Sequence, residues 1–312
     1  PLLGFEAAMQ RLVVLLSLTA CLASWRDPQL AINSSTNAAQ NYPISLLAES
    51  FTRSQSGISV VSQKHGTMGI YIIALESRKE YAISTLNELG LRESTTVVDA
   101  VNRDGFEIAD LVKAGKLREG FELSLKKWDF RRKGIIACAL SHQKAMKMFL
   151  KDKTLTHAVI FEDDIILQEG IRGRIARVQG KHPEKISVLK YLHDLAKSSN
   201  QEPTWDGLNL GICSKECGDT AKVLPGRIKL IQSSQPYCTH AYIYTRHAAE
   251  VELEANIPIY RSEDRIRVDL MGSGTFTYLS TVPRIFDQNP EDDATGGHSI
   301  HKKSTLDMPM CN

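Results

Sequence analysis

The chain has 312 residues, of which 42% are hydrophobic and 24% are charged, and its formal net charge is +2 at pH 7. This is an ordinary globular composition, long enough for one large α/β domain or two small ones. The near-neutral charge and the absence of a long single-sign run argue against nucleic-acid binding as the main activity. We therefore expect no nucleic-acid partner.

The N-terminal part is predicted to lie outside the folded domain. After Arg11, a run of mainly Leu, Val and Ala covers residues 12–23. This run is too short to span a bilayer comfortably but fits a secretory signal peptide, so residues 1–24 are predicted to be a leader. A short signal anchor, with membrane association through this segment, is the alternative. Residues 25–65 are rich in Ser, Asn, Gln and Ala and are predicted to be a polar stem, with an N-glycosylation sequon at Asn33.

These features predict a protein of the secretory pathway (the ER or Golgi lumen) or of the cell envelope. The folded domain is then expected over residues 66–298, followed by a loose polar tail over 299–312.

The folded domain begins with a strand–helix–strand pattern. Residues 68–75 are rich in β-branched and aromatic side chains, 76–89 have helical periodicity, and 95–101 form a second apolar run. Such a unit predicts parallel strands joined by a right-handed crossover. Neither a G-x-G-x-x-G sequence nor a Walker sequence is present, which argues against a dinucleotide-binding protein or a P-loop NTPase.

The strongest helical pattern covers residues 134–150 and carries Cys138 among apolar neighbours, which predicts a core cysteine. Ser141 and His142 follow on the same helix, just before the next strand. A lone helical histidine is usually a hydrogen-bonded packing residue, but the strand that follows makes a role in a site an equal alternative. Because no G-x-S-x-G sequence surrounds Ser141, a hydrolase nucleophile is not expected there.

The most informative stretch is residues 157–167, in which apolar residues run into Glu162, Asp163 and Asp164 and then resume. The apolar run predicts a strand buried on both faces of a parallel sheet, and ligands bind beyond the carboxyl ends of such strands. Carboxylates buried there without partners would be very unfavourable, and a hard divalent cation would satisfy them. A solvated acidic turn is the alternative.

The rest of the domain continues the α/β pattern. A surface helix is predicted over 183–198, short strands over 205–211 and 239–245, and a helix over 246–255. The segment 265–270 is expected to bring a further acid, Asp269, to the cleft.

Four later cysteines, Cys213, Cys217, Cys238 and Cys311, could form disulfides in a secreted domain. Zinc in the loop between Cys213 and Cys217 is the sharper alternative. No second Cys/His pair stands at ligand spacing, which favours a disulfide or a free thiol.

Several sequence blocks, taken in order, form a recognisable set. They are residues 70–75 with Arg78 and Glu80, then 98–101, 134–142, 159–164, 205–211, 239–242, 268–269 and 283–288. In order and spacing these blocks resemble glycosyltransferase family 25, the group of lipooligosaccharide sugar transferases and collagen galactosyltransferases. The resemblance covers roughly residues 68–294.

This resemblance implies a GT-A-like, Rossmann-type nucleotide-sugar-binding α/β fold with a mostly parallel central sheet. It also implies a UDP-sugar donor and a divalent metal, Mn²⁺ or Mg²⁺, that stabilises charge on the leaving diphosphate. The expected activity is transfer of a hexose, galactose or glucose, to a glycan or hydroxylated protein acceptor, as in lipopolysaccharide biosynthesis, with inversion.

The resemblance further suggests roles for individual residues. The expected metal ligands are Glu162, Asp163 and Asp164. Donor contacts are expected from Leu75, Arg78, Ala100, Ser141, His142, Glu162, Asp163 and His240. In an inverting reaction a carboxylate takes the proton of the acceptor hydroxyl, and the candidates are Asp269, Asp292 and Asp293.

Two other classes of function stay open at this point. One is a catalytically inactive family member that binds glycans or proteins, which predicts no turnover. The other is a metal-dependent phosphohydrolase that uses the same acids, but the sequence lacks the dispersed His/Asp sets that two-metal sites usually need.

Overall fold

The structure is a computed structural model that describes residues 67–121, 129–213, 218–232 and 236–289. The chain divides into two units, Pro1–Val61 and Ser62–Asn312, and all described residues belong to the second. The predicted leader, stem and tail lie outside the described residues, as does the end of the predicted domain, 290–298. Four residues singled out above also lie outside them: Cys217, Asp292, Asp293 and Cys311. None of the described helices has the length and apolar character needed to cross a membrane.

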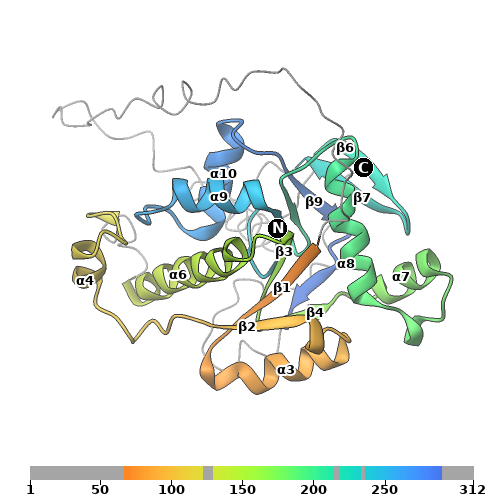
Figure 1. Ribbon diagram of the computed structural model, residues 1–312, viewed down its shortest axis with the longest axis horizontal. Helices are drawn as coiled ribbons and strands as arrows, with labels where there is room; N and C mark the ends of the chain where they lie inside the picture. Colours follow the sequence, from red (N-terminus) through yellow and green to blue (C-terminus); the bar gives the residue numbers. More distant parts are fainter. Residues whose placement is uncertain (1–66, 122–128, 214–217, 233–235, 290–312) are drawn as a thin grey trace, which may run out of the picture. The chain divides into compact units, whose positions relative to one another are not determined.

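An eight-stranded sheet organises the domain, in the order β2-β1-β3-β8-β5-β9-β7-β6 (Figure 1). Its strands are β1 (Thr67–Ala74), β2 (Thr95–Asp99), β3 (Leu155–Glu162), β5 (Gly207–Asn209), β6 (Thr220–Leu224), β7 (Ile228–Gln232), β8 (Ala241–Thr245) and β9 (Tyr278–Val282). A separate two-stranded sheet pairs β4 (Ile165–Leu167) with β10 (Phe286–Gln288).

The sheet is mixed, with its parallel part where the sequence predicts the site. Strands β2, β1 and β3 are mutually parallel, as are β5 and β9. The other four pairings within this sheet are antiparallel. The predicted Rossmann-type α/β fold is confirmed, including the strand–helix–strand opening, and the antiparallel pairings enter through β8, β7 and β6.

Helices cover both faces of this sheet. They are α3 (Lys79–Glu88), α4 (Ile108–Lys113), α6 (Asp129–Lys151), α7 (Ile171–Gln179), α8 (Val188–Lys197), α9 (Arg246–Ala255) and α10 (Glu263–Gly272), with short 3-10 turns η2 (Glu76–Arg78), η3 (Arg92–Ser94), η5 (Pro183–Lys185) and η6 (Ser198–Asn200). One buried cluster joins a face of the sheet to α3, α7 and α8, and a second joins the other face to α6, α9 and α10. Figure 1 shows α3 and α6 on opposite sides of β1.

The alternation of side chains on the central strands explains this sandwich. On β1, Ile70 and Ile72 belong to the first cluster, whereas Tyr71 and Ile73 belong to the second. Successive residues of a strand point to opposite faces, so an uninterrupted apolar strand serves two cores. Each fully buried aliphatic or aromatic side chain contributes about 1.5–3 kcal/mol.

The chain turns sharply where β3 ends. Asp163 and Asp164 form the turn between β3 and β4, and β4 then pairs antiparallel with β10. In this register Ile165 lies opposite Gln288. Strand β10, from the second half of the domain, is thereby placed next to the acids at the end of β3.

Candidate active site

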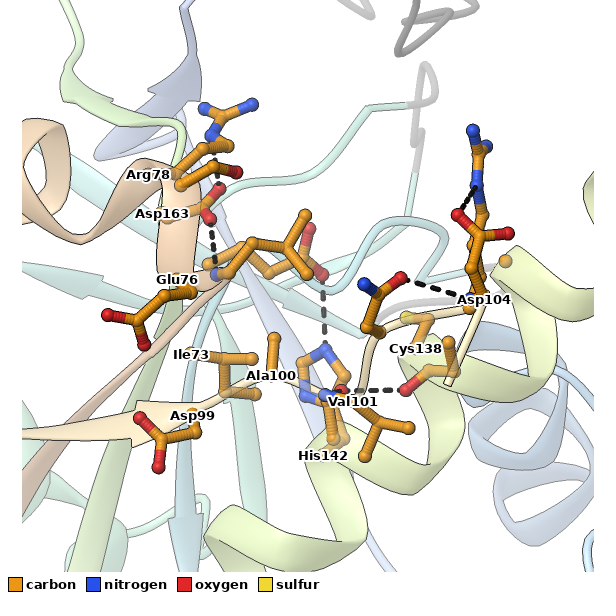
Figure 2. Close-up of a pocket in the computed structure, with 18 of the residues that line it drawn as sticks. Ile73, Glu76, Arg78, Asp99, Ala100, Val101, Asp104, Cys138, His142 and Asp163 are labelled. Atoms are coloured by element: carbon orange, nitrogen blue, oxygen red, sulfur yellow. Dashed lines mark hydrogen bonds and ion pairs between the residues drawn. The ribbon is translucent and has the colours of Figure 1, made fainter. Parts of the chain in front are cut away.

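A pocket of about 1130 Å³ opens at the carboxyl ends of β1, β2 and β3. Its walls come from the segments that follow these strands, 75–81, 99–104 and 162–163, and from α6. Because the three strands are parallel, their carboxyl ends meet at one edge of the sheet. Figure 2 shows how these segments surround the pocket.

Most of the residues predicted to contact a donor line this pocket. They are Leu75, Arg78, Ala100, Ser141, His142, Glu162 and Asp163. The remaining one, His240, is buried just behind, where its backbone carbonyl accepts a hydrogen bond from the Glu162 amide at 2.9 Å. Burial lowers the pKa of the His240 side chain. The structure therefore gathers these residues, and their role toward a donor stays a prediction.

Glu162, the last residue of β3, is held by two side chains from other elements. His142 Nε2 lies 3.1 Å from Glu162 Oε1, and the Thr239 hydroxyl donates to the same oxygen. Burial alone would raise the pKa of Glu162, but the hydrogen bonds and charges around it, led by those from His142, lower the pKa to about 2. His142 is oriented in turn by Tyr242, whose hydroxyl lies 2.9 Å from Nδ1. Glu162 is thus an ionised carboxylate in a fixed position.

Asp163, the next residue, binds the segment that follows β1. Its Oδ1 accepts from Arg78 Nε at 3.0 Å, and its Oδ2 accepts from the Leu75 amide at 3.1 Å (Figure 2). The Arg78 guanidinium also lies 5.7 Å from the centre of the Tyr81 ring. These contacts fix the segment after β1 against the turn after β3 and place one cation at the pocket wall.

Asp164 points toward the second half of the domain. Its Oδ2 accepts from Gln288 Nε2 at 2.9 Å, and its backbone carbonyl accepts from the Asn289 amide at 2.7 Å. Its Oδ1 is buried and has no hydrogen-bond partner among the described residues. Burial, followed by the charges of Glu162 and Asp163, raises the pKa of Asp164 to about 7. Asp164 is the least compensated of the three acids.

The three predicted metal ligands fit a divalent cation unequally. The buried, unpartnered Oδ1 and the raised pKa of Asp164 are what a carboxylate shows when a cation is missing from its surroundings. Among the described residues, however, the oxygens of Glu162, Asp163 and Asp164 do not converge as a set of three within 4.8 Å of one another. Asp164 therefore fits the predicted metal, and its two neighbours are engaged by His142 and Arg78.

The helix α6 contributes more than His142. Ser141 Oγ donates to the Ala137 carbonyl at 2.7 Å and accepts from the Val101 amide at 2.8 Å, which fixes the segment after β2 against the helix. Cys138 lines the pocket one helical turn before His142. Burial raises the pKa of the Cys138 thiol well above its usual value.

Of the predicted catalytic bases, only Asp269 is among the described residues, and it lies away from this pocket. Asp269 lies on α10, half exposed, and pairs with Arg261 Nε at 2.8 Å. It is not one of the residues that line the pocket. The other two candidates, Asp292 and Asp293, lie outside the described residues. The assignment of a base stays a prediction.

Four residues of the site were not assigned a role from the sequence. Thr239 holds Glu162, Tyr242 orients His142, Gln288 binds Asp164, and Cys138 lies beside His142. Only Cys138 carried a local signal, because residues four apart on a helix share a face. The other three depend on pairings between distant segments.

A disulfide joins Cys213 to Cys238. It connects the segment after β5 to the segment that leads into β8, directly before Thr239 and His240. The sequence favours a disulfide or a free thiol over zinc for the later cysteines, and this pair agrees with the first of these.

The fold and the pocket together define an α/β protein with an acidic, arginine-bearing site at the carboxyl ends of its parallel strands. The family model described as glycosyltransferase family 25 (LPS biosynthesis protein) matches residues 67–271. The chain belongs to glycosyltransferase family 25, as the sequence blocks predict, and this membership supports glycosyltransferase activity.

The other comparisons add little. No curated protein sequence matches the chain. A crystal structure from Bacillus anthracis, described as a glucose-1-phosphate thymidylyltransferase in complex with a sucrose, is 10% identical, covers 69% of this chain and 87% of that chain, and has a TM-score of 0.32. A similarity of this size carries no argument.

Proposed function

We propose that this protein transfers a hexose, galactose or glucose, from a UDP-sugar to a glycan or to a hydroxylated protein acceptor, with inversion and with the help of Mn²⁺ or Mg²⁺. Membership of the family supports the class of reaction. The choice of donor rests on the pocket, which is large enough for a nucleotide-sugar.

The observation that carries the proposal is the pairing of a cation with fixed acids at the carboxyl ends of parallel strands. Arg78 stands at the pocket wall against Asp163, and Glu162 is held ionised opposite. An arginine in this place offers planar, charge-assisted hydrogen bonds to a diphosphate. Backbone and side-chain contacts from Leu75 and Ser141 keep the two neighbouring segments in position.

In this proposal Asp164, with Asp163 or Glu162, would hold the divalent metal. A bound metal supplies Lewis-acid stabilisation of the negative charge that develops on the leaving diphosphate. The chain's own groups hold the donor: Arg78 and His142 bind and orient it while the walls of the pocket restrict its motion. Asp269 is the first candidate to accept the acceptor's hydroxyl proton, followed by Asp292 and Asp293.

We also propose an oxidising compartment, the ER or Golgi lumen or the cell envelope, for this protein. The disulfide between Cys213 and Cys238 supports it, because disulfides are rare in reducing compartments. Membrane association through the N-terminal apolar segment belongs to the same proposal.

The test is an assay of UDP release by the full chain with a panel of UDP-sugars. We expect release from one donor, with Mn²⁺ present, that EDTA abolishes and that Asp164→Asn reduces at least about a hundredfold. Asp194→Asn is the matched control, because Asp194 is an exposed acid on α8 that pairs with Lys190. Release from no donor by the folded protein, with broad acceptors supplied, would favour a non-catalytic binding protein instead.

A further inference from the structure

The pocket contains a group of metal-ligand atoms that differs from the predicted carboxylate set. Cys138 Sγ, a ring nitrogen of His142 and a carboxylate oxygen of Glu162 all lie within 4.8 Å of one another. All three residues line the pocket, and Figure 2 shows Cys138 and His142 there. They combine a thiol, an imidazole and a carboxylate, which is a different chemistry from three carboxylates.

Two of the three ligand atoms are spaced nearly as in a tetrahedral zinc site. With Zn–S near 2.3 Å and Zn–N and Zn–O near 2.0–2.1 Å, ligand atoms around zinc lie about 3.3–3.6 Å apart. His142 Nε2 and Glu162 Oε1 are 3.1 Å apart. Cys138 and His142 are four residues apart on α6, so both project from one face of the helix toward the end of β3. Cys138 Sγ lies within 4.8 Å of both atoms, so zinc binding brings the thiol closer and replaces the hydrogen bond between His142 and Glu162.

The surroundings of His142 also suit a metal ligand. Its Nδ1 lies 2.9 Å from the Tyr242 hydroxyl, which fixes the ring orientation. A hydroxyl can accept as well as donate, so Nδ1 can carry the ring proton and leave the lone pair of Nε2 for a metal. Metal-bound histidines generally have such a partner on the other ring nitrogen. His142 itself is buried, with 1% of its surface exposed, so its orientation is constrained by packing.

We propose that Cys138, His142 and Glu162 form a zinc site in the pocket, with the fourth position open to the pocket. Thiolate and imidazole ligands select zinc over the hard cations Mg²⁺ and Mn²⁺, which prefer oxygen. Three protein ligands with an open fourth position are the usual pattern of an accessible zinc site. On binding, the Cys138 thiol loses its proton to solvent and a sulfur–metal bond forms.

This inference rests on the ligand geometry. It assigns Glu162 to zinc and leaves Asp163 as the partner of Asp164 for the metal of the proposed reaction. The test therefore does not use turnover. The metal-free full chain is titrated with Co²⁺, which replaces Zn²⁺ and gives a thiolate-to-cobalt charge-transfer band in the near ultraviolet. We expect one equivalent of Co²⁺ to produce this band and Zn²⁺ to displace it.

Variants assign the band to its ligand. Cys138→Ser should abolish it, and a variant with Cys21, Cys217 and Cys311 all replaced by Ser should keep it. The loss in zinc affinity for Cys138→Ser should exceed the roughly 10–100-fold that a missing second-shell partner produces. A wild-type protein without the band, or a band that survives in folded Cys138→Ser, would overturn the proposal.

Two further variants keep the test decisive if Cys138→Ser does not fold. Glu162→Gln preserves shape and should weaken zinc binding at least about tenfold, because an amide is a poorer ligand than a carboxylate. Asp99→Asn is its matched control, because Asp99 also lines the pocket but pairs with Lys79 at 2.8 Å. Equal zinc affinities for these two variants would contradict the proposal.

Discussion

Two regions of this molecule place acids against a base, and they do so in opposite ways. In the first, Arg267 of α10 is completely buried and pairs with Glu252 at 3.3 Å and with Glu263 at 3.4 Å. In the second, the acids that end β3 meet His142 and Arg78 at the wall of an open pocket. The two regions share chemistry and differ in what surrounds it.

The Arg267 cluster is closed. The guanidinium lies 3.9, 5.2 and 5.9 Å from the ring centres of Tyr242, Tyr244 and Tyr278. Burial, followed by the charge of Glu252, raises the pKa of Glu263 well above its usual value. Burial therefore favours the protonated form of Glu263. Among the described residues, Glu252 Oε1 and Glu263 Oε2 are also buried without a hydrogen-bond partner, but neither residue lines the pocket.

The acid end of β3 is uneven instead. Glu162 is held ionised, whereas Asp164 Oδ1 is buried without a hydrogen-bond partner in the part of the chain that the structure describes. A buried charge cluster whose partners all lie within the protein stabilises the fold only when its geometry is good. A charged group that lacks such partners beside a pocket points instead to a ligand. Tyr242 stands between the two regions, with its ring on Arg267 and its hydroxyl on His142.

The largest expected effect is a loss of stability in the Arg267 cluster. Arg267→Met leaves Glu252 and Glu263 buried without their cation, and we expect a loss of about 3–5 kcal/mol in the free energy of unfolding. Urea denaturation followed by circular dichroism measures it. Arg261→Met is the control, because Arg261 pairs with Asp269 at the surface and should lose no more than about 1 kcal/mol. Equal losses in the two variants would mean that the buried ion pairs of Arg267 matter no more to stability than the surface pair of Arg261.

The next effect separates function from stability in the open region. Asp164→Asn should reduce UDP release at least about a hundredfold without lowering the free energy of unfolding. The reason is that a poorly compensated buried carboxylate is replaced by a neutral group of the same shape. Parallel assays of turnover and of urea denaturation measure both. A variant that unfolds more easily than the wild type would show that Asp164 is structural.

The pH dependence of the free energy of unfolding should report the protonation of Glu263. The folded protein keeps a proton on Glu263 at pH values where the unfolded chain, with a pKa near 4.5, has released it. Stability contributed by this group is complete below that value and is lost progressively as pH rises above it. Glu263→Gln cannot ionise, so its stability relative to the wild type should increase with pH.

Urea denaturation of both proteins between about pH 5 and pH 8 measures this difference. The charged groups that face Glu263 are Glu252, Asp264 and Arg267, and they are unchanged in the variant. A difference that stays constant or shrinks with pH would mean that Glu263 is ionised in the folded protein.

The smallest effect concerns two neighbouring tyrosines of β8. Tyr242→Phe removes the hydroxyl bond to His142, and Tyr244→Phe removes the one to Glu252. Each should lower the free energy of unfolding by about 1 kcal/mol. Only Tyr242→Phe should also reduce kcat for UDP release, with KM little changed, because only its hydroxyl orients a residue of the pocket. Equal kcat values for the two variants would show that His142 needs no such support.

Much of the fold and part of the site follow from local pattern. The apolar run before Glu162, the helix that carries Ser141 and His142, and the opening strand–helix–strand unit are all found where predicted. Burial on two faces demands an uninterrupted apolar strand, and parallel strands bring their carboxyl ends together. The gathering of Arg78, His142 and Glu162 at one edge is therefore readable from sequence.

Other features depend on segments that meet only in the folded chain. Arg267 lies in a charged segment, and it is buried because aromatic rings from β8 and β9 close around it. Similarly, Cys138 was predicted to be a core residue, and the structure places it at the pocket wall beside Glu162. Neither environment is encoded within a few residues of the side chain concerned.

The sequence alone determined the family of this protein, the strand that ends in acids and the helix that faces it, because short-range periodicity reports which faces are buried. Only the tertiary structure decided that Asp164 is the poorly compensated acid at the pocket, that Nε2 of His142 faces a carboxylate, and that Arg267 is buried. These properties arise from contacts between strands and helices far apart in the chain. The balance of burial, hydrogen bonds and nearby charges that sets them exists only once those elements have packed.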